Sequence, residues 1–174
     1  MKNKILTLGF LFLFIFVLSG CGVGEKLIEK QVEKNVEKQM NEQMGADVDV
    51  DMNKNSVNIV TEDGASIQVG EGTVLPKGFP DDVYVGDGDI VSASKNLSGE
   101  GFQVTMVSNK NIDYLKQKYT GEVTTAGWDI DSDMSMAGVT IVTANKDNRV
   151  LSLSFSPDTE QEGKAMIVLI VMEN

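Results

Sequence analysis

The residue with the most distinctive chemistry in this sequence is its only cysteine, Cys21. Its thiol is a nucleophile, and as a lone cysteine it can form no disulfide within the chain. Cys21 follows two small residues and the 14-residue apolar segment Ile5–Leu18, which begins after Lys2 and Lys4. A membrane-spanning helix needs about 20 apolar residues, whereas a secretory leader needs about 7–15. The segment therefore indicates a leader that ends at the cysteine.

The run Leu18-Ser19-Gly20-Cys21 resembles the lipobox of bacterial lipoproteins. The resemblance implies cleavage between Gly20 and Cys21, attachment of acyl chains such as palmitate to Cys21, and a mature chain that starts there. Two or three acyl chains, at about 0.8 kcal/mol per buried CH₂, anchor a small domain stably. We expect a protein on the outer membrane facing the periplasm, or on the outer face of the cell membrane in a single-membrane cell. The alternative is an ordinary signal peptide, or an uncleaved anchor, with an incidental cysteine.

Two aspartate triplets, at 47–51 and 129–133, place an acid at every second residue. The second triplet resembles the start of an EF-hand calcium loop, but Met134 and Thr140 stand where that loop needs glycine and glutamate. Both triplets alternate with apolar residues, which is typical of the solvent-facing side of a strand. We predict no metal and no cofactor.

Ser92 and Lys95 match the Ser-x-x-Lys spacing of penicillin-interacting enzymes, which requires a helix to bring both side chains to one face. The context here is strand-like, so the odd spacing sends them to opposite faces. The partner motifs of those enzymes are also missing. A hydrolase that uses this pair, or two of the 26 acidic residues, is the alternative to a non-enzymatic protein.

The composition argues against several classes of function. The 174-residue chain has no histidine, the commonest general base and transition-metal ligand. Loss of residues 1–20 removes Lys2 and Lys4 and no acid, which changes the formal net charge from −11 to −13. Such a charge argues against nucleic acid and against electrostatic adhesion to anionic lipid.

The N-terminal part of the mature chain, residues 21–44, consists of the acylated end and a helix whose apolar residues recur every four positions. Because a helix turns every 3.6 residues, this stripe winds around the axis. We interpret the helix as a tether that packs on the following domain; the alternatives are a membrane-lying helix and an oligomerising stalk. Alternating residues at 46–70, with Asp63-Gly64 as a turn, predict a three-stranded β-meander.

A Pro/Gly-rich linker at 71–82 precedes a predicted α+β domain at 83–174. We expect strands at 83–85 and 90–94, a strand that starts at Phe102, and one helix capped by Asn111 and ended by Gly127. Four further strands complete a mostly antiparallel sheet packed on that helix in two layers. The predicted core contains Phe102, Leu115, Tyr119 and Trp128. The last strand, 166–172, is apolar on both faces and should be central or covered on both sides.

Residues 75–174 resemble a module of uncharacterised envelope lipoproteins of bacteria. The resemblance rests on Leu75-Pro76, Phe79-Pro80-Asp81-Asp82-Val83, Tyr119 and Gly127-Trp128. It implies a fold and a location but no activity and no catalytic residues. Together these features predict a lipid-anchored, non-catalytic binding or assembly module. Its partners would be the membrane, through its acyl chains, and an envelope protein, with no nucleic acid.

Overall fold

The computed structural model describes residues 25–44, 46–51, 55–62, 64–96 and 100–173. The chain divides into two compact units, Met1–Gln31 and Val32–Asn174. In the first unit, the described residues are the start of helix α2 (Glu25–Met44), the helix expected at this place. The remaining described structure belongs to the second unit. Gly20 and Cys21, and with them the predicted cleavage and acylation site, lie outside the described residues.

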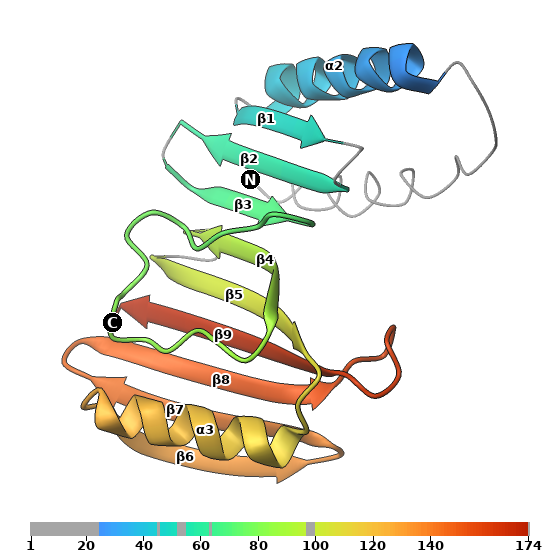
Figure 1. Ribbon diagram of the computed structural model, residues 1–174. Coiled ribbons are helices and arrows are strands. Elements are labelled where there is room, and N and C mark those ends of the chain that lie inside the picture. The colour runs from blue at the N-terminus through green and yellow to red at the C-terminus, as the bar shows by residue number, and fades with distance from the viewer. Residues whose placement is uncertain (1–24, 45, 52–54, 63, 97–99, 174) are drawn as a thin grey trace. The chain divides into compact units, whose positions relative to one another are not determined.

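The described strands form one antiparallel sheet in the order β1-β2-β3-β4-β5-β9-β8-β7-β6 (Figure 1). The fold is α+β, as the sequence predicts, and the sheet makes up most of it. β9 lies between β5 and β8, which confirms its predicted central position. The strands are β1 (Ala46–Asp51), β2 (Ser56–Thr61), β3 (Ser66–Val69), β4 (Asp89–Lys95), β5 (Gly101–Ser108), β6 (Asp129–Met136), β7 (Val139–Lys146), β8 (Arg149–Pro157) and β9 (Ala165–Glu173).

The meander of β1, β2 and β3 continues directly into the later strands. β3 pairs with β4 in a register that joins Ser66 to Lys95 and Val69 to Ser92. The strands before and after the Pro/Gly-rich segment at 71–82 therefore belong to the same sheet.

The predicted strand at Val83–Val85 is wrong, because this segment is irregular and makes no ladder. Its neighbouring backbone groups are bonded by side chains from distant parts of the chain. The Trp128 Nε1–H donates to Asp82 O at 3.0 Å, and the Tyr119 hydroxyl donates to Gly86 O at 2.5 Å. Because these backbone oxygens are hydrogen-bonded by side chains, the segment needs no strand partner. It lies over the sheet and buries Val83 in the core.

Helix α3 (Ile112–Thr125) has the boundaries that its sequence predicts. Asn111 caps its start, since Oδ1 accepts the Tyr114 backbone N–H at 2.8 Å. Gly127, with φ +85°, follows its end in the left-handed conformation that glycine adopts without strain. α3 contacts β6, β7 and β8 (Figure 1).

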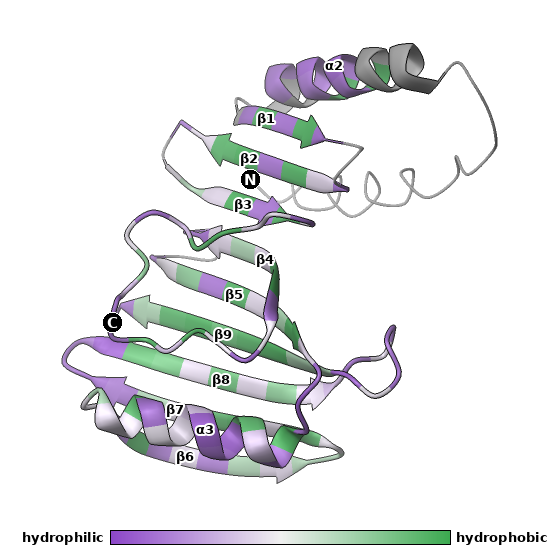
Figure 2. Ribbon diagram, in the orientation of Figure 1, coloured by the Kyte–Doolittle hydropathy of each residue, from purple (hydrophilic) through white to green (hydrophobic). Residues whose placement is uncertain are grey.

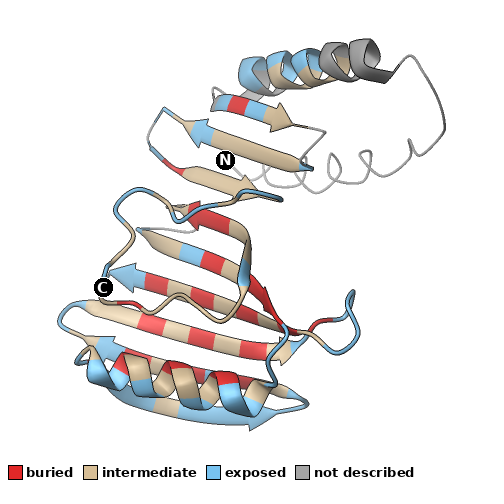
Figure 3. Cartoon of the chain, viewed as in Figure 1, coloured by how far each residue is buried: buried red, intermediate tan, exposed pale blue. Residues whose placement is uncertain are grey.

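The core lies between the sheet and the layer formed by α3 and the irregular segment before β4. Along β8 and β9, buried side chains alternate with half-buried ones (Figure 3). The predicted core residues Leu115, Tyr119 and Trp128 are buried. Phe102 is half-buried instead, because it lies at the margin of the core. Its ring packs edge-to-face with that of Phe79, with the two ring centres 5.6 Å apart.

Side chains of α2 cover the outer edge of β1. Asn41 Oδ1 accepts the Val48 N–H at 2.9 Å, and Glu37 Oε1 accepts the Val50 N–H at 3.1 Å. β1 is the first strand of the sheet, so these N–H groups have no strand to pair with. The helix thereby blocks addition of another strand at this edge.

Candidate functional site

The space between α3 and the sheet is filled by side chains. Leu115, Tyr119, Val123 and Phe155 are each at most 1% exposed. The Tyr119 and Phe155 rings pack edge-to-face, with their centres 5.6 Å apart. A ligand cavity would leave its lining side chains accessible to a molecule the size of water, and these are not. This interface is therefore packed core in the described structure.

The Tyr119 hydroxyl is the most deeply buried titratable group of this core. It donates to Gly86 O at 2.5 Å and accepts the Gly86 N–H at 3.3 Å. Burial raises the pKa of Tyr119 far above its usual value, despite the opposing effect of the Gly86 bond. The hydroxyl thus stays protonated and holds the irregular segment onto the sheet.

Asp82 lies at the centre of an ion-pair cluster. Its carboxylate accepts two hydrogen bonds from Arg149, at 2.9 and 2.7 Å, and one from Lys146 at 2.7 Å. The Arg149 hydrogen bonds, supported by Lys146, hold the pKa of Asp82 well below its usual range against the effect of burial. A carboxylate held ionised in this way does not serve as a general acid.

Trp128 joins the same cluster. The Arg149 guanidinium lies 4.8 Å from the centre of the Trp128 ring, and Lys146 also donates to Ala126 O at 2.7 Å. The cluster therefore ties together the segment before β4, the end of α3 and the β7–β8 turn. Asp82 and Trp128, two residues of the motifs named in the sequence analysis, both belong to this cluster. Their role in it is structural.

The structure separates Ser92 from Lys95. Ser92 pairs with Thr105, whereas Lys95 pairs with Phe102, and these two partners lie on opposite faces of β5. Lys95 Nζ lies 5.7 Å from the centre of the Phe102 ring. The two residues cannot act as a nucleophile and its base in this arrangement.

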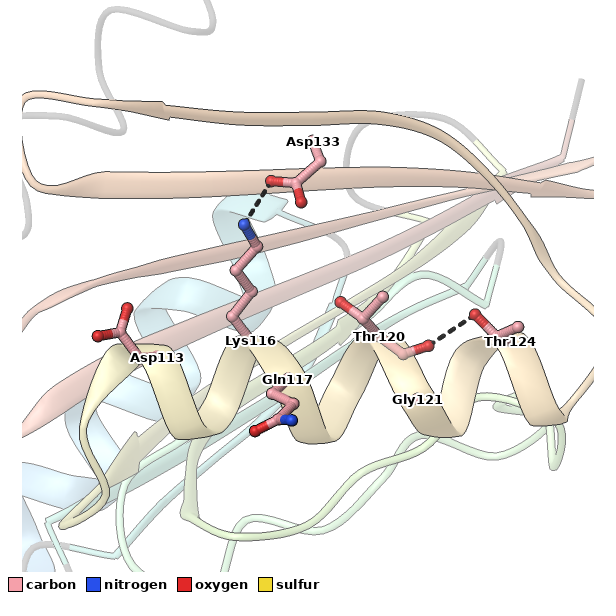
Figure 4. Close-up of a pocket in the computed structure, with 7 residues that line it drawn as sticks. All are labelled: Asp113, Lys116, Gln117, Thr120, Gly121, Thr124 and Asp133. Atoms are coloured by element: carbon pink, nitrogen blue, oxygen red, sulfur yellow. Dashed lines mark hydrogen bonds and ion pairs between the residues drawn. The ribbon is translucent and has the colours of Figure 1, made fainter.

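An open groove of about 420 Å³ runs along the outer side of α3 beside β6. Lys116 reaches across it to Asp133, with Nζ and Oδ1 2.8 Å apart, while Asp113 and Gln117 point in other directions (Figure 4). This geometry gives no pair of converging carboxylates. The lining residues are Asp113, Lys116, Gln117, Thr120, Gly121, Thr124 and Asp133.

The sheet has a second face, opposite α3. In β9, the buried residues from Ala165 to Val171 alternate with residues that turn to this second face. The pairing register brings the corresponding residues of β8, β7 and β6 to the same face. We call this surface the open face and define it by Asp129, Ser132, Met134, Met136, Val139, Ile141, Thr143, Asn145, Val150, Ser152, Ser154, Ser156, Met166, Val168, Ile170 and Met172.

The open face is mostly apolar and partly exposed, and Asp129 of β6 is the one charged side chain among the residues that define it. Met134 is 60% exposed, Met136 81%, Ile141 37% and Met172 45%. Among the described positions of β7, β8 and β9, no charged side chain turns to this face, although 24% of the chain is charged. Hydropathy colouring shows β9 as apolar along nearly its whole length (Figure 2). Large exposed apolar patches mark interaction sites.

Sequence reasoning identified the two-sided apolar character of β9 but not the open face. The available signals were the alternating methionines of β6 and the presence of a single helix among the strands that follow residue 45. One helix of 14 residues covers one face of a sheet at most.

A family model described as START domain-like matches residues 90–163, the span from β4 to the loop after β8. START-like domains are generally binding domains rather than enzymes. No curated protein matches the chain, and neither does any solved structure. Within the described residues, no helix is both long enough and apolar enough to cross a membrane.

Proposed function

We propose that this protein is a lipid-anchored, non-catalytic binding or assembly module of the bacterial cell envelope. Acyl chains on Cys21 hold the mature chain to the membrane, and α2 connects this anchor to the sheet. The lipobox resemblance supports the anchor and the location.

The open face is the observation that carries the binding role. Isolated exposed apolar residues are common on proteins, but a sheet face of four strands that is mostly apolar and carries one charged residue is not. Burying such a face against a partner removes apolar surface from water at about 25 cal/mol per Å². Binding therefore occurs on the outside of the sheet.

The sheet edges are less suited to binding. Hydrogen bonds from β1 to α2 side chains occupy one edge. The other edge, β6, carries Asp129, Asp131 and Asp133 and has a bulge between Ile130 and Ser132. Charges and bulges are features that oppose addition of a strand.

Three titratable groups of the described residues that a hydrolase could use have structural partners. Asp82 is bound by Arg149 and Lys146, Tyr119 is bound to Gly86, and Lys116 pairs with Asp133. The START-like match, to a class of domains that generally bind, also favours binding. The filled interior under α3 favours binding at the surface over binding of a ligand inside.

Metabolic labelling with a fatty acid tests the anchor. The wild-type chain should take up the label and fractionate with membranes, because the Cys21 thiol is the attachment atom. Cys21→Ala should lose both the label and the membrane association, while Ser19→Ala, a small-for-small change beside it, should keep both. Label retained by Cys21→Ala would refute the proposed anchor.

A further inference from the structure

We propose that the open face docks onto the open face of a second copy of this chain, so that two sheets stack face to face. The inference deepens the proposed function and relies on its lipid anchor. It rests on the shape, the charge and the area of the open face.

The open face is self-complementary in shape. Ser152, Ser154 and Ser156 form a row of small side chains along β8. In the sheet, β7 and β9 flank this row with longer apolar side chains, among them Ile141 and Val168. A two-fold axis along the strands, placed between β7 and β8, sets Val139 and Ile141 of β7 in one copy over the serine row of β8 in the other, and β6 of one copy over β9 of the other. The longer side chains of each copy then pack into the row of small serines of the other copy, at the usual sheet separation of about 10 Å.

Charge favours the same partner. The chain has a net charge of −11, so two copies repel one another through most surface pairings. The open face lacks charged side chains on the described parts of β7, β8 and β9. At the far end of the sheet, Val48 of β1 turns to the same side as Ile170, so Asp47 and Asp49 turn to the other side. A basic or acidic partner would find no charge to pair with on the open face of β7, β8 or β9. A second copy presents a matching, mostly uncharged surface.

The area predicts a weak dimer. The open face spans the four strands β6 to β9, each of about eight residues. At about 4.8 Å between strands and 3.3 Å per residue, its dimensions are roughly 19 by 26 Å. Two such faces bury on the order of 1,000 Å², the lower limit for a specific interface. Anchoring both copies to one membrane raises their effective concentration, so a weak interface suffices.

A lipid surface is a less suitable occupant. Segments that lie in the membrane interface usually add lysine or arginine to their apolar side chains. No such residue turns to the open face within the described parts of β7, β8 and β9.

Photocrosslinking of the full chain in cells tests the proposal. Two differently tagged copies are co-expressed, each with p-benzoylphenylalanine in place of Ile141 or, as the control, in place of Ile130. These two isoleucines are equally exposed, at 37%, but they lie on opposite faces of the sheet. Irradiation should join the two tags in a product of twice the chain's mass from position 141, and not from position 130.

A charge substitution provides the second measurement. With the crosslinker at Met172, Ile141→Glu should reduce the two-tag product by at least about tenfold, because each copy then buries an unpaired carboxylate. Ile130→Glu should leave the yield unchanged, and its equal exposure controls for effects on folding.

Three outcomes would overturn the proposal. These are an adduct from position 141 with a protein of another mass, an adduct with phospholipid, and equal two-tag yields from positions 141 and 130. The first refutes self-association and leaves the binding role intact. Loss of the fatty-acid label without Cys21 is measured separately, so failure of the anchor is distinguishable from failure of the dimer.

Discussion

Replacing Asp82 with asparagine tests whether the ion-pair cluster holds the segment before β4 to the body of the fold. The substitution keeps the size of the side chain and the hydrogen bond from Trp128, which goes to the Asp82 backbone oxygen. It removes the charge that Arg149 and Lys146 share. Both cations then lose their strongest partner.

The magnitude follows from the geometry. A hydrogen bond to a charged group contributes about 1.5–3 kcal/mol, and Asp82 accepts three of them. The side chains of Asp82, Lys146 and Arg149 are 28%, 25% and 21% exposed, so water screens and replaces part of this interaction. We expect a total loss of about 2 kcal/mol in the free energy of unfolding. For a domain of this size that loss lowers Tm by about 4–8 °C.

The assay is urea unfolding of the chain without residues 1–20, followed by circular dichroism. Asp81→Asn is the matched control, because Asp81 is the adjacent residue and is exposed. It should change the unfolding free energy by less than about 0.5 kcal/mol. Equal stability of the two variants would refute the role assigned to the cluster.

The stability that the Asp82 carboxylate provides depends on pH. The pKa of Asp82 is lower in the folded chain than in the unfolded one, so its stabilisation is complete above the unfolded-state pKa of about 4. It is lost as the pH falls through the folded-state pKa. The stability difference between wild type and Asp82→Asn should therefore be constant near pH 7 and shrink below about pH 4.

Three further substitutions test the packing around α3 by the same unfolding assay. Tyr119→Phe removes both hydrogen bonds to Gly86 and should cost about 1–3 kcal/mol, whereas Tyr114→Phe at an exposed position should cost little. Gly121→Ala should stabilise the chain by up to about 1 kcal/mol, because Gly121 lies inside a helix with open space at its Cβ position. Gly127→Ala should destabilise it by about 1 kcal/mol, because its φ of +85° strains any other residue. If both glycine substitutions stabilised the chain, or both destabilised it, the assigned end of α3 would be contradicted.

Local features of the fold could be predicted from the sequence, because each depends on neighbouring residues. The start of α3 follows from the capping side chain of Asn111, and its end follows from Gly127. The central position of β9 follows from apolar residues on both of its faces. These signals depend on spacing within a single element.

Contacts between distant residues could not be predicted in the same way. The segment at 83–85 has strand-like composition, but Trp128 and Tyr119, 46 and 33 residues away from their partners, bond its flanking backbone instead. The pairing of β3 with β4 spans the Pro/Gly-rich segment, and no periodic pattern encodes it. The open face depends on which side of the sheet the single helix covers, which is a property of the topology. The lipid attachment at Cys21 stays a prediction from the sequence.

Oxidation of methionines by peroxide tests most directly whether the open face is a docking surface in the cell. Met134, Met136 and Met172 are exposed on it, while Met106 is buried in the core. If a partner occupies the open face, these three oxidise several-fold more slowly in the intact envelope than in the diluted, purified chain, and Met106 is protected in both. A Val74→Met variant adds an exposed control methionine outside the open face, which should oxidise equally in both settings. Equal oxidation of Met134, Met136 and Met172 in the two settings would contradict the docking role.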